Sequence, residues 1–170
     1  AVYRVPSECE ECKTPTLEVL GYGTEMVEEE VSMAFPDALI ARMDLDTTRG
    51  KRAYEQIISR FEHNETNILI GTQMVSKGLD FDNVSVVGIL NADNLLNYPD
   101  FRAYEKAFQL MTQVSGRAGR KNKQGRVLLQ TSHPGHSVIN FVKRNDYKSF
   151  YQLQMDERRL FRYPPYFRLI

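Results

Sequence analysis

Two segments of this sequence hold residue types that suit phosphate chemistry. In residues 71–81, Gly71 and Gly78 allow another group to approach the backbone closely, because glycine has no Cβ. Thr72 offers a hydroxyl and an amide to a phosphate oxygen, while Asp80 is an acceptor for a ribose hydroxyl or a cation. The alternative interpretation is a polar loop whose glycines only make turns.

The second segment, residues 113–120, places Gln113, Arg117 and Arg120 at i, i+4 and i+7, so they share one face if a helix continues that far. Gly116 and Gly119 are poor helix formers that leave space beside the arginines, and the sequence offers no evident structural reason for them. Two neighbouring guanidiniums suit a clamp on a transferring γ-phosphoryl group, worth on the order of 10³ or more in rate. Alternatively, the two arginines are ordinary surface charge.

Alternating apolar runs and amphipathic stretches predict an α/β fold, with a parallel sheet and crossover helices to position both segments. The expected strands are 38–43, 67–70, 84–90 and 127–130, and the run 84–90 is expected to be central and buried on both faces. Thr24 is expected to cap a first helix that Pro36 ends. Further helices are expected at 53–61, at 100–117 and, with continuous helical spacing, from 138 to 160. The helix at 100–117 has an apolar stripe of Ala103, Ala107, Leu110 and Val114.

Composition favours one compact cytoplasmic domain. The 170 residues are 42% hydrophobic, no apolar run reaches the roughly 20 residues that span a bilayer, and the amino terminus does not have the pattern of a signal peptide. The 22 basic and 22 acidic residues cancel, but residues 106–145 hold eight bases and no acid. That stretch is either a host for phosphates or an ordinary solvated face.

The spacing of Cys9 and Cys12 predicts half of a zinc site, because a structural zinc ion needs four ligands and this pair supplies two. The three histidines lie far along the chain and are expected to be solvent-exposed or hydrogen-bonded rather than ligands. They are His63, His133 and His136.

The two phosphate-type segments together resemble motifs V and VI of superfamily 2 helicases in order and spacing. Most of the chain resembles one family of that superfamily, the bacterial replication-restart (primosomal) helicases, in the second of their two motor lobes. The matching stretches are Asp44-Leu45-Asp46-Thr47-Thr48, residues 68–81, Asn91-Ala92-Asp93, Phe101-Arg102-Ala103-Tyr104-Glu105 and residues 113–120. The cysteine pair with residues 21–25 resembles the close of that family's zinc module, and residues 157–159 with 163–165 resemble the entry to its C-terminal domain.

The resemblance implies a RecA-like lobe, a parallel sheet flanked by helices, at residues 24–162. It also implies a zinc-module remnant at 1–23 and the start of a further domain at 163–170. ATP and Mg²⁺ are implied in the parent protein. Catalytic roles are implied for Gln113, Arg117 and Arg120, ATP contacts for these three with Gly78 and Asp80, and DNA contacts for Gly71, Thr72 and Thr47. Implied partners are single-stranded and forked DNA, the first lobe of the same protein, primosome proteins and single-strand-binding proteins, with no membrane.

Two motifs of such helicases do not occur in the sequence: the phosphate loop G-x-x-x-x-G-K-[ST] and the acidic Mg²⁺-binding motif. Both belong to the family's first motor lobe, so we expect this chain to be an excised part of a longer helicase and to be inactive alone. Two other interpretations stay open. One is a non-catalytic nucleic-acid-binding or docking module, and the other is the second lobe of a different superfamily 2 translocase.

Overall fold

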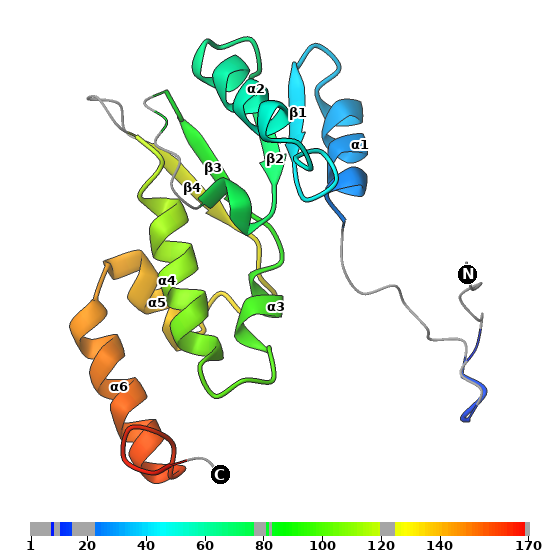
Figure 1. The fold of residues 1–170 in the computed structure, drawn as a ribbon. Helices are drawn as coiled ribbons and strands as arrows, with labels where there is room; N and C mark the ends of the chain where they lie inside the picture. The colour runs from blue at the N-terminus through cyan, green and yellow to red at the C-terminus, as the bar shows by residue number, and fades with distance from the viewer. Residues whose placement is uncertain are drawn as a thin grey trace.

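The computed structural model describes residues 8, 11–14, 23–76, 81, 83–119 and 125–168. Helices and short strands alternate along these residues (Figure 1). The order is α1 (Thr24–Ala34), β1 (Ile40–Met43), α2 (Lys51–Glu62), β2 (Ile68–Gly71), the 3₁₀ helix η1 (Gln73–Ser76), β3 (Val86–Ile89), α3 (Ala92–Leu96), α4 (Ala103–Ser115), β4 (Arg126–Leu129), α5 (Ser137–Arg144) and α6 (Tyr147–Leu160). Each of the four expected strands is found within two residues of its predicted bounds.

The strands pair in parallel, as predicted, but the described residues form two sheets of two strands each. β1 pairs with β2 from Ile40↔Ile68 to Met43↔Gly71, and β3 pairs with β4 from Val86↔Arg126 to Ile89↔Leu129. Each pair is joined by a helical crossover, through α2 in the first sheet and through α3 and α4 in the second. All four strands therefore direct their carboxyl ends toward loops of the kind that bind ligands in parallel α/β proteins.

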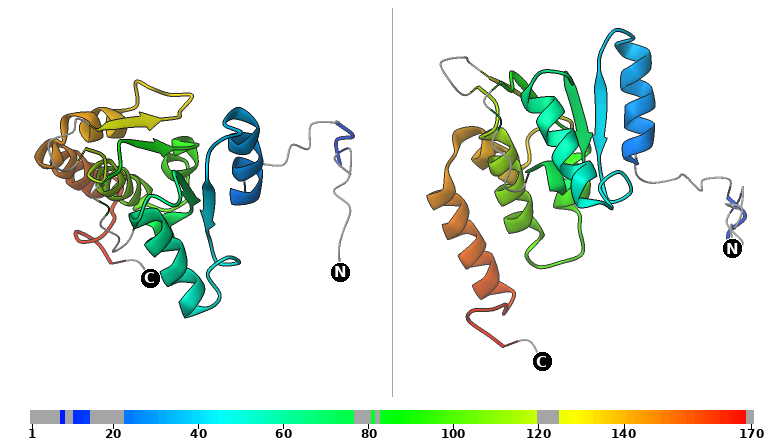
Figure 2. Two further views of the ribbon diagram at one scale, coloured as in Figure 1. Left: turned by 90° about the horizontal axis from the view of Figure 1, so that it is seen from above. Right: turned by 45° about the horizontal axis from the view of Figure 1, so that its top comes forward.

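The helices cover the two sheets unequally. Figure 2 shows β1 between α1 and α2, and both helices contact that strand. On the β3–β4 sheet, α4 contacts β3, whereas Val86, Leu90 and Leu128 have more than half of their surface exposed. The prediction that residues 84–90 are buried on both faces is therefore wrong for the described structure. Successive side chains of a strand alternate between faces, and only one face of this sheet is packed by a described helix.

The hydrophobic core is divided between two clusters. The larger one joins α3, α4, α5 and α6, and its buried members are Ala92, Leu96, Ala107, Phe108, Met111, Val138, Ile139 and Phe150. The smaller one surrounds Met43 and Phe81 and includes side chains from α2 and β2. Two members of the predicted stripe on α4, Ala103 and Ala107, are buried, and the other two, Leu110 and Val114, are partly buried.

Two predictions about helix termini are wrong. Thr24 is the first residue of α1 rather than its cap, and its hydroxyl donates to Oδ2 of Asp44 at 2.5 Å. The expected helical stretch from 138 to 160 is interrupted at Asn145, which adopts φ 50° and ends α5. Asp146 then begins α6 by accepting a hydrogen bond from the Ser149 N–H at 3.1 Å. Asparagine tolerates left-handed backbone, and aspartate satisfies the open N–H groups of a helix start, which explains the break.

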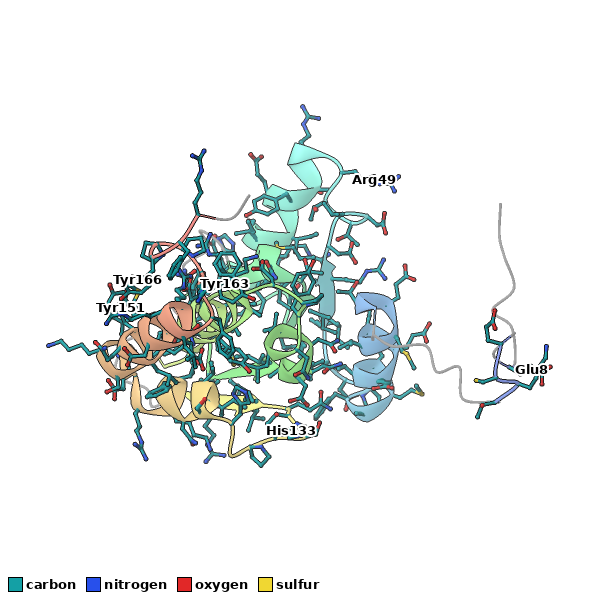
Figure 3. All side chains as sticks on the ribbon, turned by 90° about the horizontal axis from the view of Figure 1, so that it is seen from below. Glu8, Arg49, His133, Tyr151, Tyr163 and Tyr166 are labelled. Carbon is teal, nitrogen blue, oxygen red and sulfur yellow. The ribbon has the colours of Figure 1, made fainter. Side chains whose placement is uncertain are left out.

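α6 forms one side of the molecule, and Tyr151, Tyr163 and Tyr166 lie on that side (Figure 3). α6 contacts α5, and Phe150 from α6 stacks on Phe108 from α4 with a centroid distance of 4.3 Å. None of the described helices has the length and apolar character needed to cross a membrane.

Candidate functional site

The loop after β2 begins with a glycine that its neighbours require. A Cβ at Gly71 would lie 2.2 Å from Cγ2 of Val75 and 2.5 Å from the carbonyl oxygen of Met43, so no larger residue fits without displacing β1 or η1. We expected this glycine to admit a ligand, and the structure shows that internal packing already accounts for it. The next residue, Thr72, is exposed, and its carbonyl accepts a hydrogen bond from the Val75 N–H at 3.1 Å.

This loop is anchored at both ends in the smaller core cluster. Val75 packs against Met43 and Phe81, and the Phe81 ring meets Phe61 edge-on with a centroid distance of 4.7 Å. Gly78 and Asp80, predicted to contact ATP, lie outside the described residues, so their roles stay predictions.

The second candidate segment differs from the predicted helical face. α4 ends at Ser115, and Arg117 lies in the turn that follows, where its N–H donates to the Val114 carbonyl at 3.0 Å. Gln113 is still helical and exposed, whereas Arg117 is partly buried. The predicted shared face required a helix that continues through these residues, and α4 ends before Arg117, so this condition is not met. Arg120 lies outside the described residues.

The structure supplies a reason for one of the two glycines in this turn, Gly119. Gly119 adopts φ 77°, a left-handed conformation that residues with a Cβ adopt at a cost. Its N–H donates to the Val84 carbonyl at 3.0 Å, which ties the turn to the chain just before β3. Gly116 is the C-cap of α4, and its N–H donates to the Thr112 carbonyl at 3.0 Å. Gly116 has φ −68°, which any residue adopts, and an added Cβ would make only ordinary contacts, so backbone geometry explains Gly119 and not Gly116.

Packing brings the two segments together, although they are more than 30 residues apart. η1, which directly follows Thr72, lies against α4. The register of the first sheet pairs Met43 with Gly71, so Asp44 and Thr72 leave neighbouring strands at the same carboxyl edge. The loops after β1 and β2 therefore lie at one edge of the first sheet, and α4 packs against η1 in the second of these loops.

The loop after β1 is organised by Asp44, which sequence reasoning did not single out. This buried carboxylate accepts hydrogen bonds from the Thr24 hydroxyl at 2.5 Å and from the N–H groups of Asp46 at 3.0 Å and Thr47 at 2.9 Å. Its Oδ2 also lies 3.0 Å from Nε of Arg42. The hydrogen bond from Thr24 is the main cause that lowers the pKa of Asp44 to about 2, and the Thr47 N–H and the Arg42 charge act in the same direction. An aspartate followed by polar turn residues is the sequence signal that would have indicated it.

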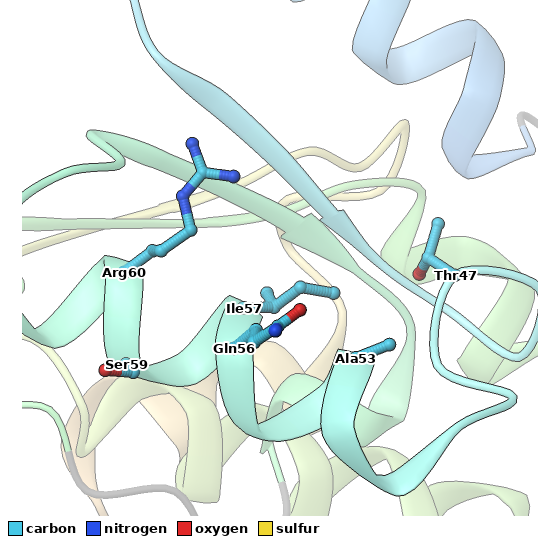
Figure 4. A pocket seen from close by; sticks show the side chains of 6 residues that line it. All are labelled: Thr47, Ala53, Gln56, Ile57, Ser59 and Arg60. Atoms are coloured by element: carbon cyan, nitrogen blue, oxygen red, sulfur yellow. The ribbon is translucent and has the colours of Figure 1, made fainter.

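Thr47, a predicted DNA contact, has its hydroxyl engaged inside this turn. The hydroxyl accepts from the Asp44 N–H at 2.9 Å and lies 3.1 Å from Oδ1 of Asp44, to which it donates. Thr47 also lines an open pocket of about 490 Å³ along α2 (Figure 4). The other lining residues are Ala53, Gln56, Ile57, Ser59 and Arg60. A DNA contact by Thr47 stays a prediction, and it would have to compete with Asp44 for the hydroxyl.

A second aspartate joins the carboxyl ends of β3 and β4. Asp93 accepts hydrogen bonds from the Ser132 N–H at 2.7 Å and from the hydroxyls of Ser132 at 2.5 Å and Thr131 at 2.6 Å. These bonds, led by the Ser132 N–H, lower the pKa of Asp93 to about 2. Asp93 was part of the resembling stretch at 91–93, but its function as a link between two loops could not be read from the sequence. His133 lies beside it, with Nδ1 3.8 Å from Oδ1 of Asp93.

The described residues do not complete a metal site. They contain no group of three or more histidine, cysteine, aspartate or glutamate side chains arranged to hold a metal ion. Cys12 is exposed, and the Thr14 hydroxyl lies 3.1 Å from its sulfur, while Cys9 lies outside the described residues. The whole sequence has only two cysteines, so the chain cannot by itself supply a four-cysteine zinc site.

Comparison with known proteins identifies the class to which these features belong. The sequence pattern of the family described as helicase conserved C-terminal domain matches residues 15–122, which include the loops after β1 and β2 and the turn after α4. The chain belongs to this helicase family.

The particular relatives agree with the resemblance drawn from the motifs. The chain is 51% identical to the replication restart protein PriA of Bacillus subtilis over 165 residues, 97% of the chain. It is 44% identical to the protein of the same name from Synechocystis over 165 residues, also 97% of the chain. For the Chlamydia pneumoniae protein of that name, the identity is 42% over 167 residues, 98% of the chain. The chain spans 20%, 20% and 22% of the length of these three relatives, respectively.

Proposed function

We propose that this chain is the second, RecA-like motor lobe of an ATP-dependent DNA helicase that acts in replication restart. The observation that carries the proposal is the packing of η1 against α4, in a chain that belongs to the helicase C-terminal family. This packing couples the proposed DNA-contacting loop at Thr72 to the helix that ends beside Arg117. A motor needs such a coupling, because the nucleotide state must change how strongly the protein binds the DNA strand.

In this proposal the turn after α4 faces the nucleotide. Arg117 and Arg120 stabilise charge on the transferring phosphoryl group, and Gln113 links the nucleotide to the loop at Thr72. Guanidiniums suit this role because they are planar, permanently charged and able to donate two parallel hydrogen bonds.

In this proposal the other predicted site residues contact the same ATP molecule or the same DNA strand. Gly78 and Asp80 contact ATP, and Gly71, Thr72 and Thr47 contact the DNA backbone. Contacts with phosphates do not read sequence, so binding is expected to be insensitive to base order and to weaken steeply with salt. Exposure of Thr72 at the carboxyl edge of β2 supports its part in this set.

In this proposal the rest of the parent protein supplies the parts of the ATP site and of the zinc site that this chain does not contain. A first lobe supplies the phosphate loop and the carboxylate that holds Mg²⁺, and ATP lies between the two lobes. Cys9 and Cys12 form half of a zinc site whose other ligands come from elsewhere in the parent. Residues 24–162 are the motor lobe, between a zinc-module remnant at 1–23 and a further domain that begins at 163. Single-stranded and forked DNA, primosome proteins and single-strand-binding proteins are its partners, in the cytoplasm.

The DNA part of the proposal is tested by Thr72→Ala in the full-length protein. Loss of the hydroxyl should weaken DNA binding several-fold and lower DNA-stimulated ATP turnover, because one phosphate contact is lost without disturbing the core. The matched control is Ser32→Ala, which removes an exposed hydroxyl of α1 that donates to the Glu28 carbonyl at 2.7 Å and belongs to none of the proposed contacts. Equal effects from the two substitutions would contradict the assignment of the carboxyl edge to DNA.

The isolated chain provides a second test. It should fold and yet release no phosphate from ATP, with or without single-stranded DNA, because the sequence contains no phosphate loop. Turnover that persists through purification and follows the protein would show that this chain holds a complete ATP site, against the proposal.

A further inference from the structure

The hydroxyl of Thr24, at the start of α1, reaches a carboxylate in another element. Thr24 is the first residue of α1, and Gly23, the N-cap, provides no side-chain cap for the open N–H groups of the helix. A threonine hydroxyl can fill that role. Instead, the Thr24 hydroxyl donates to Oδ2 of Asp44 at 2.5 Å, across a separation of 20 residues in the chain. The hydroxyl therefore serves the loop after β1 rather than the helix to which Thr24 belongs.

Asp44 in turn holds the polar groups of that loop. Its Oδ1 accepts from the N–H groups of Asp46 and Thr47 and from the Thr47 hydroxyl, at 3.0, 2.9 and 3.1 Å. Its carbonyl accepts from the N–H and the hydroxyl of Thr48. Oδ2 is bound from outside the loop by Thr24. A carboxylate that is held at one oxygen keeps its orientation, so the other oxygen stays in place for the loop.

A second contact fixes the start of α1 to the same strand. Nη1 of Arg42, on β1, lies 3.0 Å from Oε1 of Glu25, the residue after Thr24. Nε of Arg42 lies 3.0 Å from Oδ2 of Asp44, and the arginine side chain is only 15% exposed. The first turn of α1, the end of β1 and the loop after it are thus joined by one network of polar contacts.

We propose that Thr24 is a positioning residue for DNA binding, which holds Asp44 so that the loop after β1 keeps the shape in which it meets the DNA backbone. This inference rests on the proposed function, which assigns the loop to DNA through Thr47. The Thr47 hydroxyl is bound to Asp44, so a change at the other oxygen of that carboxylate alters the geometry of Thr47. Thr24 itself contacts no DNA and acts only through Asp44.

The chain offers a matched hydrogen bond with which a purely structural role is compared. The Thr131 hydroxyl donates to Oδ1 of Asp93 at 2.6 Å, at the carboxyl end of β4 in the other sheet. This bond joins a threonine and an aspartate in the same way, and neither residue is among the proposed DNA contacts. Loss of either bond should destabilise the fold to a similar extent, but only the loss of the Thr24 bond should change the response to DNA.

The test measures ATP turnover of the full-length protein against the concentration of single-stranded DNA. The titration separates the DNA concentration that gives half activation from kcat at saturating DNA. Thr24→Val keeps the shape of the side chain and removes the hydroxyl, whereas Thr24→Ser keeps the hydroxyl. Thr131→Val is the control, and circular dichroism checks that each variant is folded.

Thr24→Val should raise the half-activating DNA concentration by about three- to tenfold, the effect of one lost hydrogen bond, with kcat within about twofold of the parental value. Thr24→Ser and Thr131→Val should stay close to the parental protein. Thr24→Val combined with Thr47→Val should raise that concentration by less than the product of the two separate effects, because both changes act on one chain of hydrogen bonds.

An unchanged half-activating concentration in Thr24→Val, an equal rise in Thr131→Val, or independent effects of Thr24→Val and Thr47→Val would each overturn the inference. Loss of the fold in Thr24→Val would show a structural role alone and would overturn it as well. Failure of the proposed function looks different. In that case the parental protein would show no DNA-dependent turnover, or Thr72→Ala would leave the half-activating concentration unchanged, whatever the result for Thr24→Val.

Discussion

Replacing Asp44 by asparagine isolates the carboxylate that organises the loop after β1. Asparagine keeps the shape and one acceptor oxygen but removes the charge that faces Arg42, whose side chain is only 15% exposed. The pKa of Asp44 falls from 3.8 to about 2 in the folded protein, and at about 1.4 kcal/mol per pKa unit this difference corresponds to roughly 2.5 kcal/mol. Solvent at the edge of the turn screens part of it, so we expect the free energy of unfolding to fall by about 2 kcal/mol.

Urea denaturation followed by circular dichroism at neutral pH measures this loss, and the melting temperature should fall by about 4–8 °C. Asp46→Asn is the control from the same loop. Its side chain is 68% exposed and lies 2.7 Å from Arg49, which is 82% exposed, so its removal should change stability by no more than about 0.5 kcal/mol.

The pH dependence of the Asp44 effect has a definite direction. Because the pKa is lower in the folded state than in the unfolded state, the stabilisation is complete above the unfolded pKa of about 4 and is lost as the pH falls toward 2. The stability curves of the parent chain and Asp44→Asn should therefore converge between about pH 4 and pH 2. Equal stability at neutral pH, or a difference that persists unchanged at pH 2, would refute the reasoning.

Three further substitutions test the packing that positions the site. Gly119→Ala should lower the free energy of unfolding by about 1–2 kcal/mol, since Gly119 has φ 77°, and a urea titration that finds no change would argue against the left-handed turn. Phe150→Ala should lower it by about 3–5 kcal/mol, because Phe150 is 3% exposed and stacks on Phe108; a loss below about 1 kcal/mol in the same titration would contradict that packing. Glu105→Gln should lower the free energy of unfolding by about 3 kcal/mol, because Arg158 loses its charged partner. The same substitution should speed proteolysis of the chain after α6, and unchanged proteolysis would show that the ion pair does not hold that segment.

Sequence patterns located the elements well where one face of an element meets the core. The strand positions and the apolar stripe of α4 followed from periodicity, because burial of one face imposes that period. Sequence patterns did not predict a helix end that depends on the backbone conformation of one residue. The division of residues 138–160 into two helices depends on the left-handed conformation of Asn145.

The candidate site was predicted in its parts but not in its arrangement. The two segments were identified from residue types, yet their proximity depends on η1 packing against α4, a contact between residues distant in sequence. The engaged hydroxyl of Thr47 and the linking carboxylate of Asp93 could not be predicted, because a hydrogen-bond partner is set by the folded loops. The exposed face of β3 was misjudged, because an apolar run does not reveal which element covers each of its faces.

The central claim is that the turn after α4 supplies guanidiniums to the phosphoryl group, and Arg117→Lys in the full-length protein tests it most directly. The measurement is steady-state ATP turnover with saturating single-stranded DNA, and Arg144→Lys, at the exposed end of α5, is the control. Lysine keeps the charge but loses the forked donors, so kcat should fall by on the order of 10² or more while KM changes much less. The same result is expected for Arg120→Lys. Turnover of Arg117→Lys within about twofold of the parental rate, equal to that of Arg144→Lys, would contradict the account.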